Sequence, residues 1–104
     1  VKCMLNIGHE EQGIRLRERL EEQHKLWKFN PADLEDRARW SEYMEAYRIA
    51  VERCSTRQVP WYVIPADSRT RRNALIARLV RGALEDMQLS WPQPGYKAED
   101  FDFS

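Results

Sequence analysis

The chain opens with the stretch Val1-Lys2-Cys3-Met4-Leu5-Asn6-Ile7, which decides its fold class. The apolar side chains alternate along this stretch, with Met4 on the opposite face, and a period of two residues predicts a β-strand. A second stretch, Pro60-Trp61-Tyr62-Val63-Ile64-Pro65, is apolar on both faces, as buried parallel strands are. Because helical sequence separates the two stretches, they are predicted to form a parallel pair joined through helices.

Three helices are predicted around these strands. The first covers residues 10–22 and has a narrow apolar set, which is typical of a helix weakly anchored in a core. The second begins after Asn30, which can cap it, and its first residue is a proline, which suits that position. It continues to about residue 53. The third begins after a cap at Asp67 or Ser68 and carries a wide apolar stripe.

The second helix has an apolar seam that predicts core packing. Its members recur at spacings of four and three residues and so line one helical face. They are Trp40, Met44, Tyr47, Val51 and Cys54. Residues 23–29, which precede this helix, have no clean period and are predicted to form an irregular or short helical connector.

The predicted order is strand, helix, connector, helix, strand and helix, which is an α/β arrangement. Two parallel strands cannot cover their own edges and faces, because parallel sheets are buried structures of several strands. The chain also starts within a strand, at Val1 rather than at a methionine. These observations favour a piece of a longer protein, and a processed terminus is the alternative explanation of the start.

Composition excludes several classes of function. The 104 residues hold 17 Lys and Arg against 17 Asp and Glu, so no net charge attracts nucleic acid. No apolar run approaches the roughly 20 residues that a membrane-spanning helix needs. Cys3 and Cys54 make neither a disulfide framework nor a metal quartet, so a reduced, cytoplasmic setting is expected.

Arg15 and Arg19 are the first candidate functional residues. They stand four apart on one helical face, whereas Arg17 points elsewhere, and two converging guanidinium groups suit phosphate oxygens. The alternative is that both form ordinary surface ion pairs, with Glu11 and Glu22 respectively.

Trp27 is the second candidate, because Lys25 and Lys28 flank it in the connector. Cations beside an exposed aromatic could contact a nucleobase or a phosphate on a mobile lid. The alternative, which residue statistics favour, is a tryptophan that plugs the core. His9 and His24 have no partner visible in the sequence and are predicted to be surface residues.

Two further groups of charged residues lie on the second and third predicted helices. Asp33 with Arg37, and Glu35 with Arg39, are spaced to form ion pairs along an exposed helix. The last helix carries five arginines, which could follow a polyanion or pair with the acidic tail of the chain. These arginines are Arg69, Arg71, Arg72, Arg78 and Arg81. No glycine-rich phosphate loop, nucleophile elbow or metal-ligand cluster occurs, so the chain does not contain a complete active site by itself.

A set of motifs, in order along most of the chain, resembles the polyphosphate kinase 2 family. The blocks are Glu10-Glu11-Gln12 with Arg15 and Arg19, Leu26-Trp27-Lys28-Phe29-Asn30-Pro31-Ala32-Asp33, Trp40-Ser41-Glu42-Tyr43-Met44-Glu45-Ala46-Tyr47, Cys54-Ser55-Thr56, Pro60-Trp61-Tyr62-Val63-Ile64-Pro65-Ala66-Asp67, Arg72-Asn73, Ala77-Arg78 and Trp91-Pro92. Each block is weak evidence by itself, whereas the ordered set is specific.

The resemblance implies a P-loop-kinase-like fold, similar to thymidylate kinase, whose C-terminal part this chain forms. It implies phosphoryl transfer between inorganic polyphosphate and nucleotides such as ADP or AMP, with Mg²⁺ held by residues outside this chain. Carried over by position, Arg15 and Arg19 would be catalytic. Trp27, Lys28, Asp33 and Arg37 would bind phosphate or nucleotide from a lid at about residues 21–39.

The resemblance also has departures and rivals. Gly8 replaces a common serine, Gly13 replaces a longer residue, and residues 90–104 form an acidic tail. The expected partners are the substrates and either a second copy of the chain or the rest of the enzyme, with no nucleic acid and no membrane. The rival interpretations are a non-catalytic helical interaction module and a polyanion-binding module.

Overall fold

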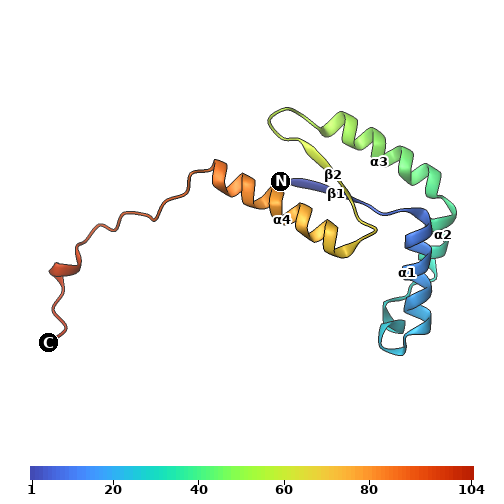
Figure 1. The fold of residues 1–104 in the computed structure, drawn as a ribbon, viewed down its shortest axis with the longest axis horizontal. Helices are drawn as coiled ribbons and strands as arrows, with labels where there is room; N and C mark the ends of the chain where they lie inside the picture. Colours follow the sequence, from blue (N-terminus) through green and yellow to red (C-terminus); the bar gives the residue numbers. More distant parts are fainter.

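The computed structural model describes residues 1–104 and has a two-stranded parallel sheet at its centre (Figure 1). Strand β1 (Lys2–Asn6) pairs with β2 (Trp61–Pro65), and Leu5 lies opposite Ile64 in the register. Both strands fall where the alternation and the proline-bounded stretch predict them. The parallel pairing of the α/β prediction is therefore confirmed.

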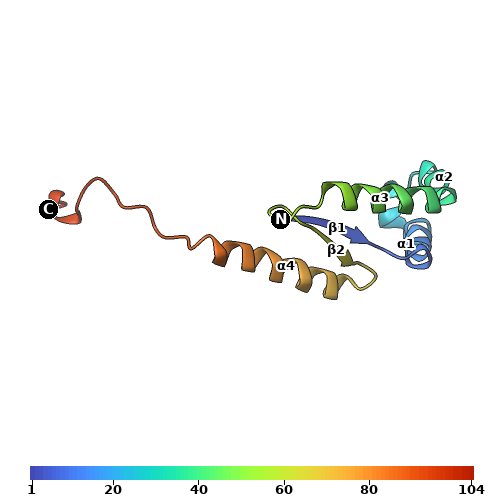
Figure 2. The same cartoon turned by 90° about the horizontal axis from the view of Figure 1, so that it is seen from above.

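Helices lie on both faces of this sheet and beyond one end of it. Figure 2 shows α3 (Trp40–Cys54) on one face and α4 (Arg69–Asp86) on the other. Helices α1 (His9–Glu21) and α2 (Ala32–Ala38) lie beyond the carboxyl end of β1. A 3₁₀ helix, η1 (Gln23–Lys28), joins α1 to α2, which agrees with the short helical connector predicted there.

The single helix predicted over residues 31–53 is wrong, because the structure divides it into α2 and α3 at Arg39. This residue leaves the helical region, with φ −101° and ψ 26°. The break coincides with a change in what the two segments pack against. Helix α2 turns toward α1 while α3 follows the sheet, and the Trp40 ring at the start of α3 packs edge-on against the His9 ring at 5.0 Å.

Of the predicted caps, Ser68 is the N-cap of α4, whereas α2 begins one residue later than predicted, with Pro31 at its N-cap and Asn30 before it. Asn30 Oδ1 accepts a hydrogen bond from the Ala32 N–H at 3.1 Å, just before α2. At the start of α4 the cap is Ser68, whose Oγ accepts from the Arg71 N–H at 3.3 Å. Asp67 is not the cap of α4 and has another partner, described below.

Very little of the chain is buried. Only Leu16, Ile64 and Ala66 are buried, with 7%, 4% and 3% of their surfaces exposed. The radius of gyration is 21.9 Å, against about 13 Å for a compact domain of this length. The tail after α4 runs away from the sheet (Figure 1), and it includes a 3₁₀ turn, η2 (Ala98–Asp100). The pairing of α4 arginines with the acidic tail, one of the two readings considered for them, does not form.

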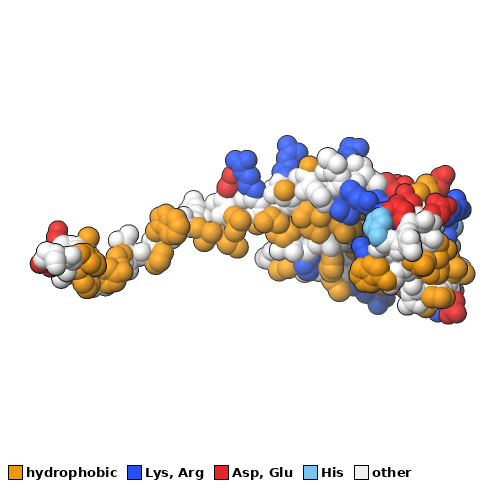
Figure 3. Space-filling view, turned by 90° about the horizontal axis from the view of Figure 1, so that it is seen from below, with side chains coloured by type: hydrophobic (Ala, Val, Ile, Leu, Met, Phe, Trp, Pro, Cys, Tyr) orange, Lys and Arg blue, Asp and Glu red, His pale blue; other side chains and the backbone are white.

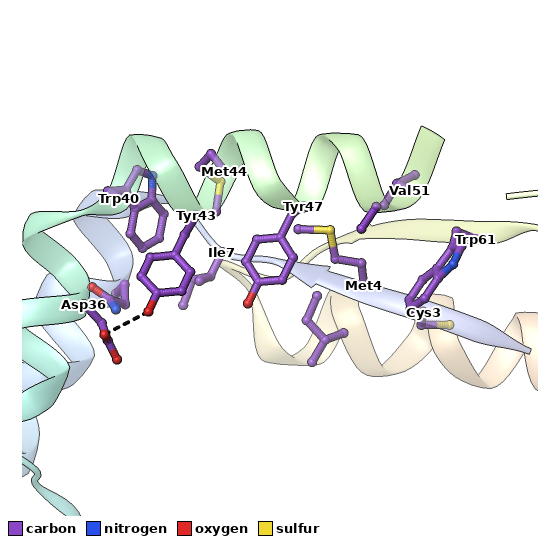
Figure 4. Close-up of a pocket in the computed structure, with 13 residues that line it drawn as sticks. Cys3, Met4, Ile7, Asp36, Trp40, Tyr43, Met44, Tyr47, Val51 and Trp61 are labelled. Atoms are coloured by element: carbon purple, nitrogen blue, oxygen red, sulfur yellow. Dashed lines mark hydrogen bonds between the residues drawn. The ribbon is translucent and has the colours of Figure 1, made fainter. Parts of the chain in front are cut away.

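Two predicted apolar faces are present but open. The seam of α3 faces β1 across a groove of about 520 Å³ (Figure 4). All of the predicted seam residues line this groove except Cys54. The apolar stripe of α4 is half-buried toward β2 but open toward its C-terminal end, where Val80, Leu84 and the following Met87 are exposed by 42%, 48% and 64%. Figure 3 shows hydrophobic side chains continuing along α4 into the tail. None of the helices combines the length and apolarity needed to cross a membrane.

Candidate functional site

The candidate site lies around α1, beginning at the carboxyl ends of the two strands. The N–H of Gly8, after β1, donates to Oδ1 of Asp67, after β2, at 2.7 Å. The strand ladder reaches the same place, because the Ala66 N–H donates to the Asn6 carbonyl at 3.0 Å. In open α/β sheets this edge is where ligands bind.

Arg15 is anchored at this edge. Its Nε donates to Glu11 Oε1 at 3.0 Å, which is the ion pair that the sequence offered as an alternative to a functional role. Its Nη2 donates to the Ala66 carbonyl at 3.0 Å and to the Asp67 carbonyl at 2.7 Å. The side chain is 18% exposed, and its Nη1 group has no partner within the chain. Arg15 therefore fastens α1 to the turn after β2 and keeps two N–H donors free.

Arg19 is held more loosely, one turn further along α1. Its Nη1 lies 3.5 Å from both the Lys28 carbonyl and Asp33 Oδ2, which is the outer limit of a hydrogen bond. The predicted pair with Glu22 does not form, because Lys25 Nζ lies 2.9 Å from Glu22 Oε2. That hydrogen bond from Lys25 lowers the pKa of the Glu22 carboxyl. Arg19 thus links α1 to residues at both ends of the turn between η1 and α2.

Arg37 reaches from α2 back to the first turn of α1. Its Nη1 donates to the His9 carbonyl and to Gln12 Oε1, the latter at 2.8 Å. The predicted pair of Arg37 with Asp33 is wrong, because these two acceptors occupy the guanidinium group instead. The backbone at Gly13 lies directly beneath it, so close that a Cβ there would be 2.7 Å from Nη2.

Trp27 and Lys28 lie on the surface of η1. The Trp27 side chain is 79% exposed, so the alternative that it plugs the core is wrong. Lys28 Nζ lies 5.4 Å from the centroid of the Trp27 ring, within the range of a cation–π contact. The pair presents a flat aromatic face and a positive charge to solvent.

The exposed face of α3 is covered by ion pairs. Arg39 pairs with Glu42 at 2.7 Å, so its predicted pair with Glu35 is wrong. Arg48 pairs with Glu45 at 2.7 Å. Hydrogen bonds from these arginines lower the pKa values of the Glu42 and Glu45 carboxyls. These contacts stabilise a helix surface and do not contribute to the cluster around α1.

The arginines of α4 stay largely unpaired. Arg81 pairs with Glu85 at 2.8 Å on the same helix, and Arg72 Nε donates to the Asn73 side chain at 3.1 Å. Figure 3 shows Lys and Arg side chains projecting from one edge of α4. No group of three His, Cys, Asp or Glu side chains that could hold a metal ion is present in the structure.

Sequence analysis missed three members of this cluster. Asp67 was considered only as a cap, although a carboxylate directly after a strand end is a signal for this edge of a sheet. Gln12 accepts a hydrogen bond across 25 positions, and Gly13 matters for its lack of a side chain. Neither leaves a local signal.

Comparison with known proteins identifies the class of protein to which this fold and cluster belong. The family described as Polyphosphate kinase 2 (PPK2) matches residues 1–92. A crystal structure of polyphosphate kinase 2 from Arthrobacter aurescens TC1 superposes with a TM-score of 0.91 at 39% identity, over 95% of this chain and 36% of that one. The chain belongs to the polyphosphate kinase 2 family.

Curated relatives agree with this assignment. The AMP/ADP-polyphosphate phosphotransferase of Meiothermus ruber is 43% identical over 99 residues, which are 95% of this chain and 37% of the relative. The ADP-polyphosphate phosphotransferase of Rhodopseudomonas palustris is 34% identical over 93 residues, or 89% of this chain and 32% of that protein. The chain therefore spans about a third of the length of each relative.

Proposed function

We propose that this chain is the C-terminal, lid-bearing part of a polyphosphate:nucleotide phosphotransferase with a P-loop-kinase-like fold. The enzyme transfers a phosphoryl group between inorganic polyphosphate and a nucleoside mono- or diphosphate. The family match over residues 1–92 is the observation that carries the proposal. The relatives named above, whose names give AMP, ADP and polyphosphate, support the choice of substrates.

Arg15 and Arg19 are the residues we assign to the transferring phosphoryl group. Phosphoryl transfer depends on positioned cations more than on covalent help from the protein. Arg15 suits this role because three hydrogen bonds already fix its side chain, so contact with a phosphate through Nη1 costs little further ordering. Arg19 suits it because contacts of 3.5 Å are readily exchanged for a phosphate oxygen.

Residues 21–39 are the lid in this proposal. Trp27 and Lys28 are exposed on η1, where they can meet a nucleotide or a phosphate chain when the lid closes. Asp33 and Arg37, also predicted to bind substrate, contact α1 at the base of the lid. Closure would exclude water, which otherwise hydrolyses the phosphoryl donor.

Mg²⁺, which the family resemblance implies, does not fit the residues of this chain. No cluster of His, Cys, Asp or Glu is placed to ligate an ion. We therefore assign magnesium to residues outside the chain and route no step through it. Association with the rest of the enzyme, or with a second copy, is part of the same proposal, because the groove beside β1 and the stripe of α4 are open.

Phosphoryl transfer from polyphosphate to ADP and to AMP tests the proposal. The assay uses the intact protein and, separately, the purified 104-residue chain. We expect product from the intact protein and none from the chain alone, because its residues form no complete site. An intact protein that uses neither acceptor would favour the non-catalytic interaction module, for which the open apolar faces provide a surface. Turnover by the isolated chain near the rate of the intact protein would contradict the incomplete site.

A further inference from the structure

The guanidinium group of Arg37, in α2, packs closely on the backbone of α1 at Gly13. The guanidinium group lies over the glycine backbone, where a Cβ would be 2.7 Å from Nη2 and 2.9 Å from Cζ. Heavy atoms do not approach a real Cβ this closely, so an alanine at position 13 would force the end of the Arg37 side chain to shift. Helix α1 therefore carries a residue of poor helical propensity where a neighbouring segment needs the space.

The same guanidinium group also donates two hydrogen bonds to α1. Its Nη1 donates to the His9 carbonyl and, at 2.8 Å, to Gln12 Oε1. The His9 carbonyl belongs to the first turn of α1, which follows the Gly8–Asp67 hydrogen bond at the strand ends. One side chain thus ties α2 to the part of α1 that is itself tied to the sheet.

Other contacts also restrain the lid, among them the hydrogen bond that the Tyr43 hydroxyl of α3 donates to Asp36 Oδ1 of α2 at 2.9 Å. Neither η1 nor α2 has a buried residue, and α2 is only 7 residues long. The other polar tie to α1 is Arg19, at 3.5 Å from its two acceptors. The apolar contribution comes from a shallow hollow where Leu16 and Leu20 of α1 face Phe29 and Leu34.

We propose that Gly13 and Arg37 form a latch that positions the lid on α1. Arg37 is then a positioning residue, which sets where Trp27 and Lys28 stand and does not itself bind phosphate. This inference rests on the proposed function, because residues 21–39 act as a lid over substrate only if the protein is a phosphotransferase. It replaces the substrate-binding role that the family resemblance implies for Arg37.

The experiment is hydrogen exchange of the amides of residues 23–38 in the intact protein, with Gly13→Ala compared against Gly82→Ala. Both substitutions raise helix propensity. A Cβ at Gly13 displaces Arg37, whereas one at Gly82 meets nothing within 4 Å. We expect exchange to become about tenfold faster or more in Gly13→Ala and to stay unchanged in Gly82→Ala.

Two further variants complete the test. Arg37→Ala should accelerate exchange as Gly13→Ala does, and the double variant should be no faster, because both remove one contact. Arg37→Lys, which can reach one of the two acceptors, should restore part of the protection. Unchanged exchange in Gly13→Ala, or additive effects in the double variant, would overturn the latch.

Kinetics on the same proteins separate the latch from the proposed function. For a positioning role, Gly13→Ala should raise KM for nucleotide or polyphosphate several-fold more than Gly82→Ala does, with a smaller change in kcat. If the wild-type protein transfers no phosphoryl group while exchange still responds to Gly13→Ala, the proposed function fails and the contact stands. If transfer is normal and exchange does not respond, the latch fails and the function stands.

Discussion

The backbone N–H of Gly8 donates to Oδ1 of Asp67 over 2.7 Å, although 59 residues separate the two in the sequence. This hydrogen bond joins the turn after β1 to the turn after β2. The carbonyl of Asp67 also accepts from Arg15 Nη2 at 2.7 Å. The turn at Asp67 is therefore held from both sides, and a carboxylate lies at the positive end of α1.

Asp67→Ala should lower the free energy of unfolding of the intact protein by about 1 kcal/mol, through loss of the hydrogen bond and of the charge at the helix end. Asp67→Asn keeps an acceptor and should lose less. Urea unfolding measures both. Asp86→Ala, at the end of α4, is the control and should have little effect. Equal losses for Asp67→Ala and Asp86→Ala would show that the Gly8 contact does not stabilise the protein.

The ion pairs on α3 predict a specific acid titration. Hydrogen bonds from Arg39 and Arg48 hold the pKa values of Glu42 and Glu45 below the ordinary 4.5. Because the folded-state values are the lower ones, their contribution to stability is present above pH 4.5. It is lost as the pH falls through the folded-state pKa values.

Carboxyl titration by NMR checks this prediction with an internal control. Arg39→Ala should raise the pKa of Glu42 and leave that of Glu45 unchanged, because Arg48 still bonds Glu45. A shift of both carboxyls, or of neither, would mean that the local hydrogen bonds are not the cause.

Trp27 should matter for substrate and not for folding. Since 79% of its surface is exposed, Trp27→Ala should change the free energy of unfolding by no more than about 0.5 kcal/mol. It should raise KM for nucleotide or polyphosphate. Trp40→Ala, which removes a ring from the groove and from its contact with His9, should destabilise the protein clearly more. If Trp27→Ala lowered the free energy of unfolding more than Trp40→Ala does, Trp27 would have to be packed in the core.

The open apolar faces predict the behaviour of the isolated chain. The groove between α3 and β1 is lined mainly by hydrophobic residues, and the C-terminal part of the stripe on α4 is uncovered. We expect self-association or poor solubility, because uncovered apolar faces and a free strand edge recruit other chains. Sedimentation equilibrium over a range of concentrations measures this. A cooperatively folded monomer at high concentration would contradict the prediction.

Local sequence patterns predicted the elements of the fold well. The strands follow from alternation and from flanking prolines, and the hydrogen bonds that Asn30 and Ser68 accept at the helix starts follow from residue type. The break at Arg39 could not be predicted in this way, since the residues around it favour a helix. At the break, Trp40 packs on His9, which lies 31 residues earlier in the sequence, and no local pattern encodes such a contact.

The contacts of the candidate site were harder to predict than its residues. Arg37 has Asp33 four residues before it, so the sequence suggests a local ion pair, whereas the folded chain offers it the His9 carbonyl and Gln12. The sequence left two interpretations of Trp27 open, an exposed lid residue and a residue that plugs the core, because large aromatic residues usually are buried. The structure places it on the exposed surface of η1, which has no buried residue.

The central claim is that Arg15 and Arg19 face the transferring phosphate, and kcat for transfer from polyphosphate to ADP tests it most directly. In the intact protein, Arg19→Ala should lower kcat by the order of 10²-fold or more, because the lost cation contacts transition-state charge. Arg15→Ala should do the same and also reduce stability, since it loses the bonds to Ala66 and Asp67. Arg17→Ala, on another face of α1, should leave kcat nearly unchanged. Equal effects of all three substitutions would contradict the assignment and reduce these arginines to general surface charge.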